Sequence, residues 1–140
     1  MKIKTANTDA GILACYPVMA QLRPHLTPDE FLARVKRQSE NSAFKLVYLA
    51  EGKDVLAVGG IRIGEWLAGG KYLEIEDLVT ADGARSEGHG GRLFDWIVDY
   101  AKTEGCDELK LVSNVTRYDA HRFYLNKRMK IQAYYFSMAL

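Results

Sequence analysis

The 140 residues carry 19 basic and 18 acidic side chains, and 48% of the residues are hydrophobic. A net charge of +1 lacks the basic excess that non-specific binding of nucleic acid or of an anionic membrane requires, so we expect neither partner. The length and composition predict a single cytoplasmic domain over residues 1–140, without a signal peptide or a membrane-spanning stretch.

The first half of the chain predicts a strand, two helices and a strand hairpin. Residues 1–6 alternate in polarity as a short strand does, and residues 8–22 have a helical pattern that Pro17 should kink or split. The sequence TPDE at 27–30 combines a threonine N-cap, a proline at the first helical position and a capping-box glutamate. Residues 44–66 predict two strands joined by a Gly-Lys-Asp turn.

The middle of the chain predicts a third strand and a long helix. The strand pattern covers residues 69–80, and residues 88–104 repeat apolar side chains at helical spacing. The apolar side chains that we expect to form one face of this helix are Leu93, Trp96, Ile97, Tyr100 and Ala101. Gly105 follows the helix and is the residue type that commonly ends one.

The C-terminal part predicts a further strand, helix and strand. These are ELKLVSN at 108–114, AHRFYLNK at 120–127 with Asp119 as its cap, and KIQAYYFSMAL at 130–140. Three consecutive strands favour an antiparallel meander, whereas a strand–helix–strand unit favours a parallel pair. The element order therefore predicts an α/β (α+β) fold, a mixed sheet with helices on both faces.

The cysteines and histidines do not indicate a metal or redox site. Cys15 and Cys106 lie far apart in helix-like segments, and we interpret them as buried reduced thiols rather than a disulfide or a catalytic thiol. His25, His89 and His121 have no metal-ligand spacing with one another or with the cysteines, so no metal is expected.

Three glycines open the long helix. Gly88, Gly90 and Gly91 would leave backbone N–H groups accessible at the positive end of the helix dipole, where phosphate groups bind. Arg85 adds a positive charge at the start of this loop. The P-loop sequence GxxxxGK[ST] is absent, and GHGGRL does not match the dinucleotide sequence GxGxxG. Loop chemistry alone thus leaves open which anion binds, or whether the loop is an ordinary glycine-rich turn.

The run LVTADGARSEGHGGRL at 78–93 resembles the acyl-CoA-binding motif of the GCN5-related N-acetyltransferase (GNAT) family. The family pattern Arg/Gln-x-x-Gly-x-Gly/Ala is filled by residues 85–90. Asn114 at the end of the next strand and DAHRFYLNKRMK at 119–130 match further family features, and the strand order matches as well. The resemblance covers essentially the whole chain. It implies a mostly antiparallel central sheet with one parallel, splayed strand pair.

The resemblance implies acetyl-CoA as cosubstrate, its pyrophosphate on the loop and its pantetheine arm paired with a strand edge. The residues implied to bind acetyl-CoA are Leu78, Val79, Thr80, Arg85, Ser86, Glu87, Gly88, His89, Gly90, Gly91 and Asn114. A backbone N–H near Leu78 or Val79 would stabilise the oxyanion.

Acetyl transfer to an amine needs a base for the ammonium group and an acid for the leaving thiolate. The resemblance implies Tyr124 as the acid and Glu76 as the base, with Glu74 in reserve. Glu74 and Glu76 share one face of a strand, and Asp77 is expected on the other. Where many members have Gly-Phe after the tyrosine helix, this chain has Arg128-Met129. The arginine would adopt a left-handed conformation at a cost of about 1 kcal/mol, or the turn would differ.

The expected acceptor is a small-molecule primary amine. Leu22, Arg23, His25 and Trp66 are plausible walls of its pocket. A protein N-terminus or lysine as acceptor, a domain that only senses acyl-CoA, and a nucleotide-binding module are the alternatives. Many relatives dimerise through their last strands, so a homodimer is possible.

Overall fold

The computed structural model describes residues 1–140. The chain forms two compact units, Met1–Lys110 and Leu111–Leu140. The first holds three helices and nearly all of the sheet, and the second holds the last helix and the C-terminal segment. That both units belong to one domain stays a prediction. No helix has both the length and the apolar character that crossing a membrane requires.

A five-stranded sheet is the centre of the first unit. In the order in which they lie side by side, its strands are β1 (Lys2–Thr5), β2 (Phe44–Glu51), β3 (Asp54–Trp66), β4 (Gly70–Thr80) and β5 (Glu108–Leu111). Strands β1 to β4 pair antiparallel, and β4 and β5 form the one parallel pair. The predicted mixed, mostly antiparallel sheet is therefore confirmed, although the strand predicted to reach residue 114 ends at Leu111.

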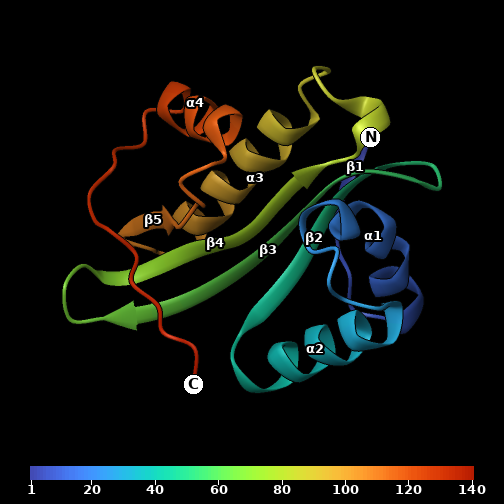
Figure 1. Cartoon of the computed structure of the whole chain (residues 1–140), viewed down its shortest axis with the longest axis horizontal. Coiled ribbons are helices and arrows are strands. Elements are labelled where there is room, and N and C mark those ends of the chain that lie inside the picture. The colour runs from blue at the N-terminus through green and yellow to red at the C-terminus, as the bar shows by residue number, and fades with distance from the viewer. The chain divides into compact units, whose positions relative to one another are not determined.

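Four α-helices accompany the sheet. They are α1 (Asp9–Leu22), α2 (Pro28–Asn41), α3 (His89–Thr103) and α4 (Tyr118–Asn126). Within the first unit, α1 and α2 cover one face of the sheet and α3 covers the other (Figure 1). Helix α3 carries the chain from β4 to β5, which is the crossover that a parallel pair requires.

Helices α1 and α2 begin with threonine caps. Thr8 and Thr27 each accept a hydrogen bond from the backbone N–H three residues later, at 3.1 and 3.2 Å. The Thr27 hydroxyl also donates to the Glu30 carboxylate at 3.0 Å, so the glutamate binds the cap hydroxyl rather than the cap amide of a regular capping box. Pro17 lies inside an unbroken α1, so it does not split the helix.

Alternation along β2 divides the core between the two faces of the sheet. Phe44 and Leu46 join a buried cluster with side chains of α1 and α2. Val47, which alternates with them, lies with Ile97 of α3 against Gly59 of β3. The apolar face predicted for α3 is buried at Leu93, Ile97 and Ala101, with Phe94 in addition. Trp96 and Tyr100, which were predicted on the same face, are only half-buried. Their rings stack with the centroids 5.3 Å apart.

Helices α3 and α4 end in the same way although their sequences differ. Gly105 follows α3 with φ 73°, and Arg128 follows α4 with φ 69°. At each end, the residue after the left-handed one donates its N–H to the carbonyl five residues earlier, at 3.0 Å in α3 and 3.1 Å in α4. This is the Schellman arrangement. Arg128 thus adopts the left-handed conformation, the first of the two alternatives expected for this turn.

Two predictions for the second unit are wrong. Asp119 does not cap α4: Arg117 is the N-cap residue, and the Asp119 carboxylate instead binds Arg122 one turn later at 2.9 Å. Residues 130–140, predicted as the last strand, form no strand, and their side chains are exposed. The alternation of apolar residues predicts a strand only if a neighbouring strand supplies hydrogen bonds, and this segment has no such pairing.

Candidate active site

The loop between β4 and α3 is fixed at its start and left-handed at its end. Its first part is a short 3₁₀ turn, Asp82–Ala84. The Gln21 side chain of α1 donates to the Thr80 carbonyl at 2.8 Å and accepts from the Asp82 N–H at 3.0 Å. Gly88, with φ 83°, is the N-cap residue of α3. The glutamine thus ties the loop to α1 where β4 ends.

The N-terminus of α3 has no side-chain cap, unlike those of α1 and α2. The first helical hydrogen bond runs from the Arg92 N–H to the Gly88 carbonyl at 3.0 Å. The N–H groups of His89, Gly90 and Gly91 come before it and have no acceptor within the helix. They lie at the positive end of the helix dipole, which is the arrangement that binds phosphate groups.

The backbone geometry favours glycine at two of the three glycine positions of the loop, Gly88 and Gly90. The φ of Gly88 lies in the left-handed region, where a side chain would be strained. A Cβ on Gly90 would lie 2.9 Å from the Thr80 hydroxyl, so the helix start can approach β4 only without one. The glycines therefore bring the N-terminus of α3 against the end of β4.

The polar side chains of the loop pair with one another. Arg85 binds Asp82 at 2.7 Å, and both side chains are about two-thirds exposed. Ser86 is exposed with φ 68°. The His89 ring is buried, and its Nε2 lies 3.0 Å from the Glu87 carboxylate. Arg85 is thus the exposed cation of the loop, whereas His89 can face a ligand only through its backbone.

The end of β4 extends past its shorter neighbour β5. Leu78, Val79 and Thr80 pair with β3 on one side. Strand β5 lies beside the first part of β4, because the Asp107 N–H preceding β5 binds the Lys71 carbonyl at 2.6 Å. With only four residues, the parallel β5 ends before Leu78. The backbone edge of β4 predicted to bind the cofactor is therefore free of β5.

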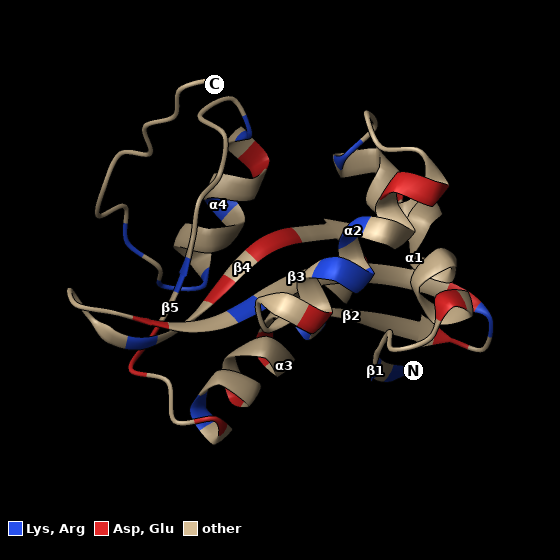
Figure 2. Cartoon of the chain, turned by 90° about the horizontal axis from the view of Figure 1, so that it is seen from below, with Lys and Arg blue, Asp and Glu red and all other residues tan.

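Glu76 is held by an arginine. The Arg62 guanidinium of β3 donates to both carboxylate oxygens of Glu76, at 2.7 and 3.1 Å. It also donates to the Gln38 side chain at 2.6 Å and to the Ser42 carbonyl at 2.8 Å, which fixes Glu76 to the end of α2. The hydrogen bond to Glu76 is the main cause that raises the pKa of Arg62. Figure 2 shows the acidic segments of β4 beside a basic segment of β3.

A β-bulge changes the alternation of side chains along β4. Consecutive residues of β3 pair with Ile75 and with Asp77, so Glu76 is one residue extra. The Asp77 carboxylate lies beside Gly60, next to the Phe44 ring that packs with α1 and α2. Asp77 therefore faces the same side as Glu76. The prediction that it faces the other side is wrong, because alternation does not hold across a bulge.

Asp77 has a second arginine as its partner. Arg23, just after α1, donates to the Asp77 carboxylate at 2.9 Å and to the Glu76 carbonyl at 3.0 Å. Burial raises the pKa of Asp77, and the charge and hydrogen bond of Arg23 oppose that rise only in part. Sequence reasoning missed Asp77 and Arg62 as site residues. The available signal was the glycine pair 59–60 in a strand, which often marks a bulge.

Glu74 belongs to the same face. It stands opposite Arg62 in the register of β3 and β4. Its carboxylate lies 3.8 Å from the Lys110 ammonium, beyond hydrogen-bond distance. The face covered by α1 and α2 thus has three carboxylates in a row, from Glu74 to Asp77.

The second unit holds the other two predicted site residues. The Asn114 side chain accepts from the N–H and the hydroxyl of Thr116, at 2.9 and 2.7 Å, and so shapes the turn before α4. Tyr124 of α4 is buried. Burial raises the pKa of Tyr124, although the charge and hydrogen bond of Arg117 lower it. The phenol therefore keeps its proton at neutral pH, as a general acid must.

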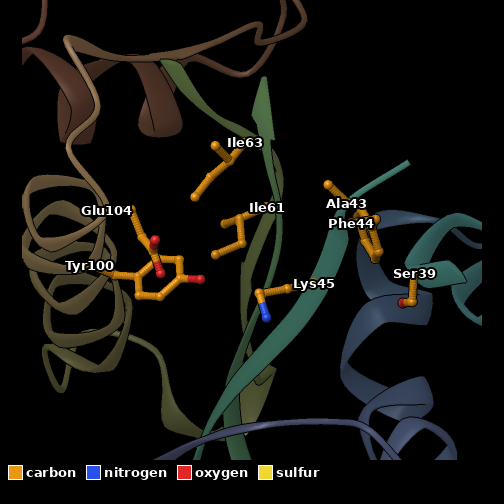
Figure 3. A pocket seen from close by; sticks show the side chains of 8 residues that line it. All are labelled: Ser39, Ala43, Phe44, Lys45, Ile61, Ile63, Tyr100 and Glu104. Carbon is orange, nitrogen blue, oxygen red and sulfur yellow. The ribbon is translucent and has the colours of Figure 1, made fainter. Parts of the chain in front are cut away.

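A cavity of about 410 Å³ lies between the end of α2, the start of β2, β3 and α3, and Ser39, Ala43, Phe44 and Lys45 form part of its lining. Figure 3 shows Ile61 and Ile63 of β3 facing Tyr100 and Glu104 of α3. Arg62 lies between the two isoleucines in sequence and so points to the opposite face. None of the three carboxylates of β4 lines this cavity.

Neither cysteine is arranged for catalysis. Cys15 and Cys106 are both free. Cys15 is buried as predicted, and burial raises the pKa of its thiol to about 12, whereas Cys106 is only half-buried. No three His, Cys, Asp or Glu side chains are grouped to hold a metal ion.

Comparison with known proteins gives one consistent family. The family model "Acetyltransferase (GNAT) family" matches residues 12–129. The chain is 34% identical over 122 residues to the uncharacterized N-acetyltransferase YhdJ of Bacillus subtilis, covering 86% of each protein. It is 36% identical over 67 residues to the aminoalkylphosphonate N-acetyltransferase of Salmonella typhimurium, covering 48% of this chain and 44% of that protein.

Solved structures agree with the family model in fold. The aminoglycoside N-acetyltransferase AAC(6')-Iy, solved in complex with CoA, superposes with a TM-score of 0.86 at 12% identity, covering 99% of this chain and 93% of that one. At this identity the likeness shows the fold alone.

Proposed function

Since the chain belongs to the acetyltransferase (GNAT) family, we propose that it transfers an acetyl group from acetyl-CoA to a primary amine of a small molecule. The observation that carries the proposal is the uncapped N-terminus of α3 against the free edge of β4. The relative named for aminoalkylphosphonates supports a small amine as acceptor.

The proposed cofactor site combines helix and strand backbone. The N–H groups of His89, Gly90 and Gly91 bind the pyrophosphate, and Arg85 leaves Asp82 to add a charged contact. The pantetheine amides pair with the β4 edge as an added strand does. The residues proposed to contact acetyl-CoA are Leu78, Val79, Thr80, Arg85, Ser86, Glu87, Gly88, His89, Gly90, Gly91 and Asn114.

The proposed reaction is direct attack in a ternary complex. The neutral amine nitrogen forms a bond to the thioester carbon, and a backbone N–H near Leu78 or Val79 stabilises the oxyanion. The C–S bond then breaks, and Tyr124 donates its proton to the CoA thiolate. Its raised pKa supports this role, because the phenol is protonated when the thiolate leaves.

Glu76 is the proposed base that takes the proton of the acceptor ammonium, directly or through water. Its pairing with Arg62 fixes its position but also occupies both of its oxygens. Asp77 is a second candidate, because its side chain is only 16% exposed, its pKa is raised, and Arg23 binds only one of its oxygens. Glu74 is the reserve candidate.

Calorimetric titration with acetyl-CoA, CoA and ATP tests the cofactor site. In Gly88→Asp the new carboxylate lies at the anion site, and Gly88→Asn is a matched control, since both residue types tolerate positive φ similarly. We expect acetyl-CoA and CoA to bind the wild type and the Asn variant, and the Asp variant to lose binding. Preference for ATP, or equal binding by both variants, would contradict the proposal.

An assay of thiol release distinguishes an acetyltransferase from a domain that only senses acyl-CoA. Tyr124→Phe should lower kcat about 10²- to 10⁴-fold while acetyl-CoA still binds. An acyl-CoA sensor would bind acetyl-CoA but release no thiol with any amine. A protein acetyltransferase would release thiol with peptides and not with small amines, so both kinds of acceptor belong in the assay.

A further inference from the structure

The end of the β3–β4 hairpin has a cluster of aromatic and charged side chains, here called the hairpin subsite. It consists of Trp66, Tyr72, Glu74, Glu108 and Lys110. The Lys110 Nζ lies 3.6 Å from the centroid of the Trp66 ring and 4.1 Å from that of Tyr72. The two rings meet edge to face at 5.9 Å. The Trp66 ring N–H donates to the Glu108 carboxylate at 2.9 Å, which fixes the ring orientation.

Two glycines make room for this cluster. A Cβ on Gly64 would lie 2.5 Å from the Tyr72 hydroxyl oxygen, so only glycine lets the ring lie across β3. A Cβ on Gly69 would lie 2.6 Å from the Glu108 carboxylate and 3.0 Å from the Trp66 ring nitrogen. The sequence GEWLAGG thus has a packing role beyond that of a turn.

The hairpin subsite is complementary to an alkylammonium group. Two aromatic faces attract a cation within about 6 Å of their centroids. Glu74 adds a carboxylate oxygen 3.8 Å from Lys110 Nζ, and Glu108 adds a second carboxylate. The cluster has two negative charges against one positive charge. Trp66 is 44% exposed, so a ligand can reach the rings from solvent.

The hairpin subsite and Glu76 are on the same face of the sheet. Arg62 stands opposite Glu74 in the register and binds the Glu76 carboxylate. At the rise of a strand, Glu74 lies roughly 7 Å from Glu76 along β4, and Tyr72 roughly 14 Å. An acceptor with its amine at Glu76 and its length along β4 would therefore reach the subsite.

We propose that the hairpin subsite binds a second ammonium group of the acceptor, in place of the Lys110 ammonium, so that diamines and polyamines are the preferred acceptors. The inference rests on the proposed transferase function, which puts the reacting amine near Glu76. Exchange of one ammonium for another keeps the cation–π contacts and releases Lys110 on its flexible stem into water.

Fluorescence titration in a Trp96→Phe background tests the proposal, because Trp66 is then the only tryptophan. The probes are diaminooctane, octylamine and aminooctanoate, titrated with and without CoA. They share a primary amine and a similar length and differ in the charge of the far end. We expect diaminooctane to bind roughly 2- to 30-fold more tightly than the other two.

Two variants test whether the hairpin subsite causes the preference for diaminooctane. Lys110→Met removes the competing ammonium and should tighten diaminooctane binding, whereas Trp66→Leu, followed by calorimetry, should abolish the preference. Equal affinity for the three probes would overturn the proposal. So would a preference for aminooctanoate that disappears in Lys110→Met, since Lys110 would then bind an anion. Diaminooctane preference in a protein that fails to bind acetyl-CoA would keep the subsite and reject the transferase function.

Discussion

Glu76 and Asp77 are neighbours on β4, each bound by an arginine, but the two pairs differ in geometry. Both oxygens of Glu76 are bound by Arg62, whose side chain is 20% exposed and anchored to α2. Asp77 is only 16% exposed, and a single nitrogen of the 40% exposed Arg23 binds it. Glu76 is thus the more accessible and more firmly held carboxylate, and Asp77 the more buried and less fully paired one.

The difference shows that two adjacent carboxylates, each with an arginine partner, can differ in burial and in how completely they are paired. Pairing favours the charged carboxylate, and burial favours the neutral one. A base needs access to the amine, a defined position and a pKa that lets it accept a proton. Glu76 meets the first two requirements best, and burial raises the pKa of Asp77 in the direction that the third requires.

The largest expected effect comes from removing each carboxylate in turn. If Glu76 is the base, Glu76→Gln lowers kcat about 10²- to 10⁴-fold, and Asp77→Asn lowers it less. Initial rates with saturating acetyl-CoA measure both, and unchanged acetyl-CoA affinity shows that the cofactor site is intact. The reverse order of effects would assign the base to Asp77. Equal, small effects would mean that neither residue takes the proton.

A methyl group at Gly60 should disturb Asp77 and spare Glu76. A Cβ there would overlap the Asp77 carboxylate and lie 2.8 Å from the Phe44 ring. We expect Gly60→Ala to lower the free energy of unfolding by about 1–3 kcal/mol, as overpacking does.

Gly59→Ala is the matched control for Gly60→Ala. Its Cβ would point to the α3 face and lie 3.3 Å from the nearest atom, the Ile97 Cδ1. Urea unfolding should show a smaller loss of stability for this neighbour. An equal loss in both variants would mean that any methyl group in this strand is destabilising, and that contact with Asp77 is not the reason.

Substitution of Arg62 should lower the free energy of unfolding more than substitution of Arg23. Arg62→Lys cannot bind Glu76, Gln38 and Ser42 at once, so we expect a loss of about 1–2 kcal/mol in the free energy of unfolding. Arg23→Lys keeps a charge near Asp77 and loses one part-buried hydrogen bond of a side chain that is 40% exposed, so we expect a loss of less than about 1 kcal/mol. Thermal unfolding of both variants at one pH compares them directly. A larger loss from Arg23→Lys would mean that the link between α1 and the bulge matters more than the bidentate pair.

Local signals in the sequence predicted most of the fold. Caps such as Thr27 and apolar spacing such as Leu93 to Ile97 depend on neighbours within a few residues, so the sequence displays them directly. The last strand failed because residues 130–140 have no partner strand, and the cap at Asp119 failed because α4 begins earlier, at Tyr118, with Arg117 as its N-cap residue. The bulge at Glu76 was not predicted, because only the register against β3 reveals the extra residue.

The candidate site was predicted unevenly for the same reason. Loop glycines such as Gly88 form a contiguous motif, and the structure places them at an uncapped helix start. Arg23 and Arg62 are distant from β4 in sequence, and no spacing rule links them to Glu76 or Asp77. Trp66 and Lys110 likewise meet only through the fold.

The smallest expected effect is a pH dependence of stability at Asp77. Because burial raises the pKa of Asp77 in the folded chain, the native state binds this proton more tightly than the unfolded state does. The stabilisation from that proton is fully present below the unfolded pKa of about 3.9 and is lost as the pH rises through the folded pKa. Asp77→Asn cannot titrate, so its free energy of unfolding should rise relative to that of the wild type as the pH rises through this range.

Urea unfolding at several pH values from about 4 upward measures the difference, with Asp119→Asn at an exposed carboxylate as the control. A difference that shrinks with rising pH would mean that Arg23 outweighs burial at Asp77.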